Sequence, residues 1–365
     1  MKKHEKFNEV IEIKDLNKSQ EKIVHSVTLT EIQGNGTIDR IYDKGIITEV
    51  DKVIFLNLQN PALPKIISSS NLKQDTSGYV NTFLGIHNNC AFINTGYIGL
   101  QIINVADFQK PQYLGLFKDY GLTLKMAFSN NRAINQSGIF DISDLNNPKI
   151  LKKYDVQVFD FIVKENSLVY SSSSELGSFI ELMKLDEGNK FRISSTLKHN
   201  FIYGDSVLKD IGSDYLLAAS GNGIGIIEIK APYERLDLKK VSDLEIDPSF
   251  LVMTGKSCFL RTIPYLGNLL VFCNLQNPLE PKRLFTFDAG NLVYFTANEK
   301  YLAYSIFEDG DKQDKNYSLT VLKTTPESPP ELIGSISVQD LSTFEVIDNA
   351  IYVFEKDGLK IYEIK

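Results

Sequence analysis

The sequence contains the same pentapeptide, Asn-Leu-Gln-Asn-Pro, at residues 57–61 and at residues 274–278. Each copy follows a run of β-branched or aromatic residues, and a second proline, Pro64 or Pro281, stands three residues after each copy. A segment that recurs at a regular spacing indicates a fold assembled from copies of one supersecondary unit. This repeat constrains the fold more than the length of 365 residues does.

A relaxed form of the pattern recurs along the whole chain as an apolar run, a short polar turn and a proline-like anchor residue. Clear copies end at Pro111, Pro148 and Pro330, and weaker copies place Ser19, Phe191 and Arg235 at the anchor. The eight anchors, at positions 19, 64, 111, 148, 191, 235, 281 and 330, are roughly 44 residues apart on average, which is typical of propeller blades of four strands.

The rest of each unit is consistent with four antiparallel strands. A short apolar stretch follows the anchor, and two alternating runs precede the next copy, as in residues 122–128 and 132–135 around the turn-like residues 129–131. No segment has a helical period sustained over three turns. We therefore predict an all-β chain, with residues 1–365 forming a single closed β-propeller of about eight four-stranded antiparallel blades. Seven blades are the alternative if one weak copy is a decoration.

The two ends of the sequence predict how the ring closes. Residues 358–365 resemble the third strand of a unit with no outer strand after it, whereas residues 22–28 resemble an outer strand. If the N-terminal strand joins the C-terminal blade, no open sheet edge is left between the first and last units. Residues 10–13 (VIEI) are then left over as a candidate extra strand.

Composition narrows the class of partner. The chain has 22 Phe, 17 Tyr and no Trp, and its formal net charge is -7. It has no basic stripe, so we expect neither nucleic acid nor an anionic membrane as a partner. No apolar stretch long enough for a signal peptide or a membrane span is visible, which predicts a cytoplasmic protein without membrane insertion. A removed leader would instead place it at the cell surface or in the periplasm.

Three copies of the unit, residues 53–67, 99–115 and 137–151, resemble the LVIVD repeat. That pattern is a glycine-led apolar strand, an acidic or amide residue, a polar turn and a proline. The acidic or amide place is held by Asn57, Asn104, Asp141 and Asn274. The resemblance implies a β-propeller, often found in bacterial surface or exported proteins, with no common enzymatic activity and no catalytic motif to transfer.

No catalytic residue, metal site or cofactor is predicted. The four histidines, at positions 4, 25, 87 and 199, lack ligand spacing, and Cys90, Cys258 and Cys273 lie among apolar neighbours and are expected to be buried. Residues 309–314 lack the full calcium-loop pattern and are expected to form a hairpin tip. Residues 221–225 are expected in a hairpin, and the serines at 171–174 in a turn.

Propeller geometry places a ligand at the mouth of the central channel, where the loops leading into the innermost strands converge. Candidates there are Asp39, Asn81, Thr123, Asp160, Asp205, Asp247, Asn291 and Ser342. Their acidity favours a polar or cationic ligand over a phosphate, although polar residues also surround channel mouths for solubility alone.

The leading hypothesis for function is a non-enzymatic scaffold that presents a rigid face to a protein or to a polar small molecule. One alternative is a hydrolase or lyase that uses acids at the channel mouth, with paired carboxylates of different pKa as its signature. Another is an exported surface protein involved in adhesion or envelope interactions.

Overall fold

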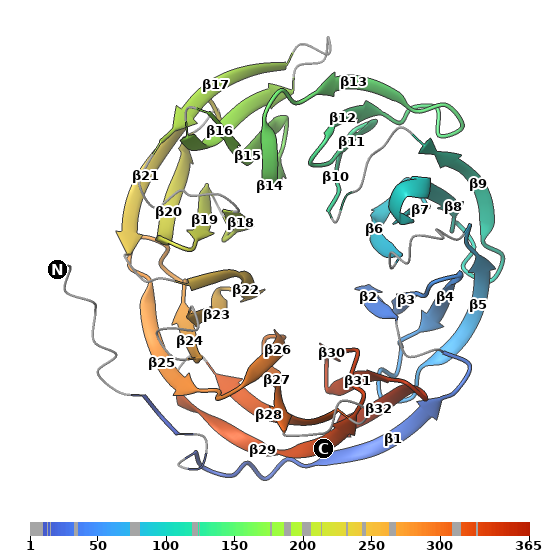
Figure 1. Ribbon diagram of the computed structural model, residues 1–365, viewed down its shortest axis with the longest axis vertical. Helices are drawn as coiled ribbons and strands as arrows, with labels where there is room; N and C mark the ends of the chain where they lie inside the picture. The colour runs from blue at the N-terminus through green and yellow to red at the C-terminus, as the bar shows by residue number, and fades with distance from the viewer. Residues whose placement is uncertain are drawn as a thin grey trace.

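The computed structural model describes residues 10–12, 14, 16–32, 36–73, 81–118, 123, 125–175, 177–185, 191–198, 206–212, 214–230, 233–242, 246–262, 268–308, 315–325 and 328–365. These residues form eight four-stranded sheets arranged in a ring around a common axis (Figure 1). The predicted β-propeller of eight blades is confirmed, and the alternative of seven blades is wrong.

Each of the first four blades is a meander of consecutive antiparallel strands. Blade 1 comprises β2 (Thr37–Ile41), β3 (Lys44–Thr48), β4 (Lys52–Asn57) and β5 (Lys65–Asn71). Blade 2 comprises β6 (Thr82–His87), β7 (Cys90–Asn94), β8 (Leu100–Asn104) and β9 (Gln112–Phe117). Blade 3 comprises β10 (Ala127–Ser129), β11 (Arg132–Ile134), β12 (Gly138–Asp141) and β13 (Lys149–Lys153). Blade 4 comprises β14 (Gln157–Lys164), β15 (Ser167–Ser174), β16 (Gly177–Leu185) and β17 (Phe191–Leu197).

The remaining blades follow the same order, except that the last one takes its outer strand from the N-terminus. Blade 5 comprises β18 (Val207–Asp210), β19 (Tyr215–Ser220), β20 (Gly223–Lys230) and β21 (Arg235–Ser242). Blade 6 comprises β22 (Ile246–Thr254), β23 (Ser257–Thr262), β24 (Leu269–Asn274) and β25 (Lys282–Asp288). Blade 7 comprises β26 (Leu292–Ala297), β27 (Tyr301–Glu308), β28 (Asn316–Thr325) and β29 (Ser328–Gln339). Blade 8 comprises β30 (Thr343–Ile347), β31 (Ala350–Glu355), β32 (Gly358–Ile364) and β1 (Ile23–Leu29).

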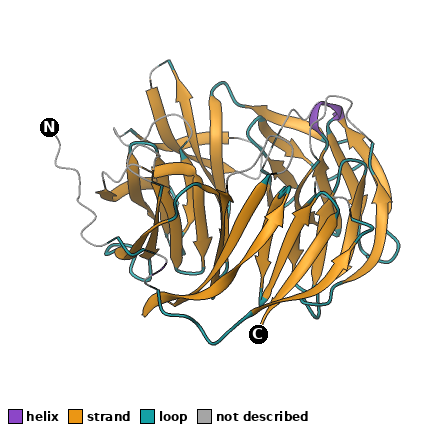
Figure 2. Cartoon of the chain, turned by 60° about the horizontal axis from the view of Figure 1, so that its bottom comes forward, coloured by secondary structure: helices purple, strands orange, loops and turns teal. Residues whose placement is uncertain are grey.

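Gly96–Ile98 forms a single 3-10 turn, drawn in purple in Figure 2. Among the described residues, no helix is long and apolar enough to cross a lipid bilayer. The described part of the chain is therefore built almost entirely from strands and the turns between them.

The core consists of apolar clusters between neighbouring blades. Phe55 of blade 1 packs in one cluster with Ile93 of blade 2, and both side chains are fully buried. The middle strands are covered on both faces, which explains their nearly continuous apolar sequences. Each such side chain contributes about 1.5–3 kcal/mol by burial, so the contacts between blades hold the ring together.

Ring closure takes the predicted form. β1 pairs antiparallel with β32, from Ile23 opposite Ile364 to Leu29 opposite Leu359. The main-chain atoms of Lys22 and Lys365 exchange two further hydrogen bonds of 2.7 and 2.9 Å. Before β1, the chain runs along the outside of β25 and β29 (Figure 1). There Ile11, from the candidate extra strand, makes one isolated parallel bridge to Phe287.

In four blades, the acidic or amide residue of the repeat closes the turn that follows the third strand. The Oδ1 atom of Asn57 accepts a hydrogen bond of 2.9 Å from the main-chain N–H of Gln59, two residues on. The equivalent bonds at Asn104, Asp141 and Asn274 measure 2.9, 2.9 and 2.7 Å. A side chain of this type mimics a main-chain turn, which explains the preference at this position.

Every blade also has a β-bulge in its outermost strand. The extra, unpaired residue is Ile67, Leu114, Leu151, Ser194, Lys239, Leu284, Ile333 and Ser26 in blades 1 to 8 in turn. In six blades it lies three residues after the predicted anchor, as Ile67 does after Pro64. A bulge twists an edge strand and discourages pairing with other sheets. The need for a bulge at this place explains why the anchor and the turn before it are repeated in the sequence.

The prediction of a turn at residues 171–174 is wrong, because these serines form the end of β15. Ser171 and Ser172 are buried, and both hydroxyls have hydrogen-bond partners, one in the next blade and one in the same sheet. Ser171 Oγ donates a hydrogen bond of 2.6 Å to the carbonyl oxygen of Ser206, and Ser172 Oγ donates one of 3.1 Å to Glu181 Oε2. The hairpin predicted at residues 221–225 is confirmed, with its turn at residues 221–222. Residues 309–314 lie outside the described residues.

Candidate functional site

The predicted site residues lie on, or just before, the innermost strands. Asp39, Asp160 and Asp247 are in β2, β14 and β22, whereas Asn81, Thr123, Asn291 and Ser342 precede β6, β10, β26 and β30. Asn81, Thr123 and Asp160 are buried, Asp39 and Asp247 are half-buried, and Asn291 and Ser342 are exposed. Asp205 lies outside the described residues. The candidates therefore occupy very different environments.

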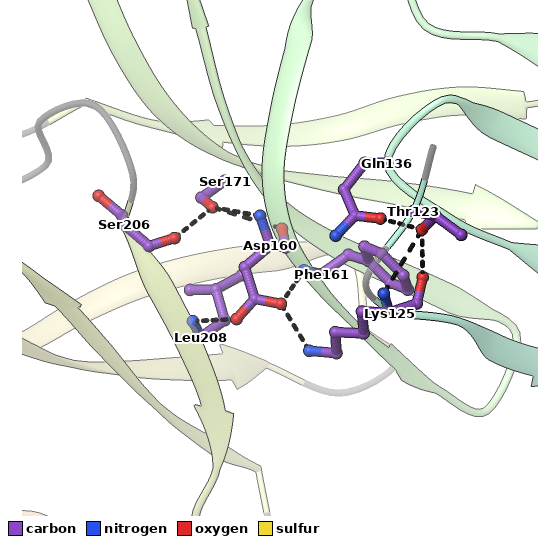
Figure 3. Close-up of polar contacts among 8 residues, drawn as sticks. All are labelled: Thr123, Lys125, Gln136, Asp160, Phe161, Ser171, Ser206 and Leu208. Atoms are coloured by element: carbon purple, nitrogen blue, oxygen red, sulfur yellow. Dashed lines mark hydrogen bonds and ion pairs between the residues drawn. The ribbon is translucent and has the colours of Figure 1, made fainter. Parts of the chain in front are cut away.

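Asp160 lies at the junction of three blades (Figure 3). Its Oδ1 atom forms an ion pair of 2.6 Å with Lys125 Nζ and accepts a hydrogen bond of 2.8 Å from the main-chain N–H of Phe161. Its Oδ2 atom accepts a bond of 2.7 Å from the N–H of Leu208 in blade 5. Thr123 joins the same network because its hydroxyl donates to the carbonyl oxygen of Lys125 and to Gln136. The structure thus links Thr123 and Asp160 through Lys125.

Each carboxylate oxygen of Asp160 is therefore already engaged by the protein. Groups saturated in this way hold neighbouring elements together, and removing one partner leaves the others buried without a bond. The ion pair and the bond to Leu208 connect blades 3, 4 and 5 near the axis of the ring. The geometry assigns Asp160 to the stability of the ring.

Two other candidates also make bonds that fix the backbone. Asn81 Nδ2 donates hydrogen bonds of 2.7 Å to the carbonyl oxygens of both Glu49 and Val50, and so joins blade 2 to blade 1. Asp247 Oδ1 accepts a bond of 3.1 Å from the N–H of Ser249 inside the irregular part of β22. These contacts are the kind that satisfy buried or turn-forming polar groups in any fold.

A different arrangement surrounds Asp39. Together with Glu345 of β30 it lines a groove of about 330 Å³, whose wall also contains Arg40, Asn298 and Asp348. The groove therefore takes residues from blades 1, 7 and 8. Thr296 of β26 donates a hydrogen bond of 2.5 Å to Glu345 Oε1.

The two carboxyl groups of this groove have raised pKa values. Burial raises the pKa of Asp39 to about 6. Burial also raises the pKa of Glu345 to about 7, and the negative charge of Asp39 adds to that increase. Desolvation and a neighbouring like charge both favour the neutral acid. Near neutral pH the groove therefore contains two acids that change charge over a narrow range.

Tyr42 stands at the hairpin turn next to this groove, and 89% of its surface is exposed. Its φ is 54°, a left-handed conformation that is unusual for a bulky residue. Arg40 Nε donates a hydrogen bond of 2.7 Å to the carbonyl oxygen of Tyr42, and the Arg40 guanidinium forms an ion pair with Asp348 of blade 8. Two contacts from one arginine thus hold the turn in place.

The repeat shows how unusual Tyr42 is. The residues at the same turn position in blades 2, 3, 4, 6 and 8 are Asn88, Asn130, Glu165, Gly255 and Asp348, all with positive φ. Asparagine, aspartate and glycine are the residues that tolerate this conformation best. Sequence reasoning missed Tyr42, although an alignment of the hairpin turns would have identified it as the aromatic exception.

The groove is adjacent to the turns between first and second strands, whereas the predicted mouth is formed by the loops that lead into the first strands. Those loops include residues 74–80 and 199–205, which lie outside the described residues. A ligand at that mouth stays a prediction. The described part of the chain contains no group of three or more histidine, cysteine, aspartate or glutamate side chains placed to hold a metal ion.

Cys90 and Cys258 are buried, as predicted, but Cys273 is only half-buried. Cys258 lies directly opposite Cys273 in the pairing of β23 with β24. The hydrogen bond with the Cys273 thiol and, after it, burial raise the pKa of the Cys258 thiol well above its usual range. This favours a neutral thiol over a reactive thiolate at position 258.

Comparison with known proteins gives likeness in structure alone. No protein-family model matches the sequence, and no curated protein matches it. The resemblance to the LVIVD repeat therefore stays a prediction.

Three solved structures resemble this chain over 80% or more of its length. The crystal structure of Saccharomyces cerevisiae Sqt1 has a TM-score of 0.59 at 9% identity, covering 96% of this chain and 99% of that one. A hypothetical selenium-binding protein from Sulfolobus tokodaii has a TM-score of 0.54 at 9% identity, covering 94% and 93%. A functionally unknown protein from Desulfotomaculum acetoxidans has a TM-score of 0.52 at 14% identity, covering 80% and 95%. At these identities the likeness establishes the fold alone, and by its fold this chain is a β-propeller.

Proposed function

We propose that this protein is a non-enzymatic scaffold that binds a protein partner at the face formed by Tyr42 and the groove of Asp39 and Glu345. The observation that carries the proposal is the exposed Tyr42 in a strained turn. A left-handed conformation costs a non-glycine residue on the order of 1–3 kcal/mol, and such strain concentrates at functional positions. Exposed aromatic side chains are also the residues that contribute most at protein interfaces.

The charges of the neighbouring groove indicate what kind of partner it would bind. Asp39, Glu345 and Asp348 bring three carboxyl groups to a wall that holds one cation, Arg40. A partner that places a lysine or arginine in this groove and an apolar surface on Tyr42 would complement both features. This proposal also includes polar small molecules that carry a positive charge.

The site can be tested with a photo-crosslinking amino acid placed at residue 42, compared with the same amino acid at residue 130. Both positions have the same turn geometry, with φ values of 54° and 53°. We expect a discrete crosslinked partner from position 42 that excess unlabelled wild-type protein competes away and the Tyr42→Asn variant does not. Equal crosslinking from both positions, or equal competition by both proteins, would contradict the proposal.

The raised pKa values of Asp39 and Glu345 favour one second candidate, a hydrolase or lyase. Two carboxyl groups that share a groove and titrate near neutral pH can supply a general acid and a general base. Purified wild-type protein and the Glu345→Gln variant would be compared on panels of ester, glycoside and phosphoester substrates. Turnover that disappears in the variant supports an enzyme whose active site includes Glu345. Turnover that survives in the variant shows that the activity does not depend on Glu345. An exported location stays a prediction in both cases.

A further inference from the structure

The segment before β1 shows how an outer strand of this propeller can bind an extended chain. The main-chain N–H of Leu332, in β29, donates a hydrogen bond of 2.8 Å to the carbonyl oxygen of Asn17. The N–H of Ser19 donates one of 2.8 Å to the carbonyl oxygen of Leu332. Lys18 thus forms a parallel bridge with Leu332, and the buried Leu16 packs in the same apolar cluster as the Leu332 side chain.

Four other blades place an exposed apolar residue at the position that Leu332 holds, and blade 5 places the half-buried Leu238 there. In each case this residue pairs with the third strand directly beside the bulge, as Leu332 pairs with Leu322. The four exposed residues are Ile66, Tyr113, Ile150 and Ile193, with 39%, 39%, 38% and 47% of their surfaces exposed. Because the register is the same, their main-chain N–H and C=O groups point away from the blade, as those of Leu332 do.

The outer strand of blade 3 carries positive charge and would therefore prefer a segment of negative charge. This strand, β13, has the sequence Lys-Ile-Leu-Lys-Lys, with three lysines and no acidic residue in a chain whose net charge is -7. Lys149 and Lys153 are exposed and Lys152 is half-buried. An acidic segment would be attracted to this edge, whereas a basic one would be repelled. The strand lies on the rim of the ring, far from the N-terminal segment (Figure 1).

We propose that the edge of β13 binds an extended acidic segment of a partner protein as an added parallel strand. The segment exchanges main-chain hydrogen bonds with Ile150 and places an aliphatic side chain over the Ile150 side chain, as Asn17, Ser19 and Leu16 do at Leu332. Its carboxylates lie near Lys149, Lys152 and Lys153. Addition of a strand to an exposed edge is an established way for sheets to bind peptides, with affinity from the main chain and specificity from the side chains. This surface is separate from the Tyr42 groove.

The probe for the test is a fluorescein-labelled peptide of residues 10–20 in which both lysines are replaced by glutamate. We expect saturable binding in a fluorescence anisotropy titration that weakens as salt is added. Hydrogen exchange should slow in the β13 region when the peptide is present. Slower exchange only at β29 would overturn the proposal, because the peptide would then occupy the edge that the N-terminal segment already uses. Equally tight binding of the unmodified peptide would also overturn it, because the edge of β13 would then show no preference for an acidic segment.

Variants separate main-chain pairing from charge. Ile150→Pro removes the N–H that donates to the peptide, and proline is tolerated on an edge strand. We expect it to weaken binding at least about tenfold, whereas Tyr113→Pro, at the same position of blade 2, leaves binding unchanged. If Ile150→Pro does not fold, the Lys152→Glu and Lys153→Glu double variant replaces it, with a similar loss expected. Unchanged binding in the folded variants would contradict the proposal.

Discussion

Arg40 Nε lies 2.7 Å from the carbonyl oxygen of Tyr42, so the side chain of an innermost strand holds the main chain of the turn that follows it. The same guanidinium reaches Asp348 of blade 8. The turn is thereby fixed in a conformation that its own tyrosine disfavours. Strain that neighbouring contacts impose in this way can be measured by substitution.

Replacing Tyr42 with asparagine should stabilise the protein. Asparagine occupies the same position in blades 2 and 3 and tolerates a φ near 54°, so the substitution should raise the free energy of unfolding by about 1 kcal/mol. Urea denaturation at pH 7 measures the change. The reverse substitution, Asn130→Tyr, is the matched control and should lower the free energy by a similar amount. A destabilised Tyr42→Asn protein would show that the tyrosine ring is structural.

Glu345 should make stability depend on pH. Its pKa is raised from 4.5 to about 7, so the stability it contributes is fully present below pH 4.5 and is lost as the pH rises through 7. Asp39 acts in the same direction between about pH 4 and pH 6. Glu345→Gln should remove the loss of stability that Glu345 causes, which is on the order of 1–3 kcal/mol at pH 8.

The measurement is denaturant unfolding at pH 5 and pH 8. The exposed Glu234→Gln variant is the control and should follow the wild-type curve. If Glu345→Gln gains no stability at pH 8 relative to wild type, the carboxyl group is less desolvated than the structure indicates.

Asp160 should matter for stability whether or not a ligand is present. Alanine at this position leaves Lys125 and the N–H groups of Phe161 and Leu208 without their acceptor, which should cost about 2–4 kcal/mol. Thermal unfolding of Asp160→Ala is the measurement, and Asn291→Ala, at an exposed candidate position, should change the melting temperature little. A wild-type melting temperature for Asp160→Ala would show that these three contacts contribute little to stability.

Because β1 closes the ring, two N-terminal deletions that differ in whether they keep β1 should behave differently. Removal of residues 1–20 takes away the segment outside β25 and β29 but leaves β1, so the protein should stay folded and monodisperse. Removal of residues 1–29 also exposes the edge of β32, and we expect aggregation because an open strand edge pairs with other sheets. Size-exclusion chromatography with light scattering distinguishes the two. A monodisperse product from the longer deletion would show that β1 is dispensable.

The fold followed from the sequence because its main determinant is local and repeated. The Asn57 turn and the proline three residues before the Ile67 bulge recur in blade after blade, so the spacing of the anchors predicted the strands and the blade count. The serines at 171–174 were misread because four polar residues in a row look like a turn. Their hydroxyls find partners such as the carbonyl of Ser206, which no local pattern reveals.

The candidate site was harder to predict because its parts are distant in sequence. Asp39 and Glu345 meet only because blade 8 lies beside blade 1 in the closed ring. Asp39 was identified from its place on an innermost strand, but nothing in the sequence paired it with Glu345. Asp160 was identified by the same reasoning, yet the ion pair to Lys125 gives it a structural role. Position along the repeat predicts where a side chain lies, and not whether its neighbours already satisfy it.

The pairing of β1 with β32 also sets a time order for biosynthesis. β1 is synthesised before the strands of the other seven blades, whereas the remaining strands of its own sheet are synthesised after them. At typical rates of synthesis, β1 waits roughly 20 to 70 s for its partner. During that interval blades 1 to 7 are synthesised while β1 has no strand to pair with. Closure of the ring is therefore the last step in folding the propeller, and until it occurs the unpaired edge of β1 is open to pairing with other chains.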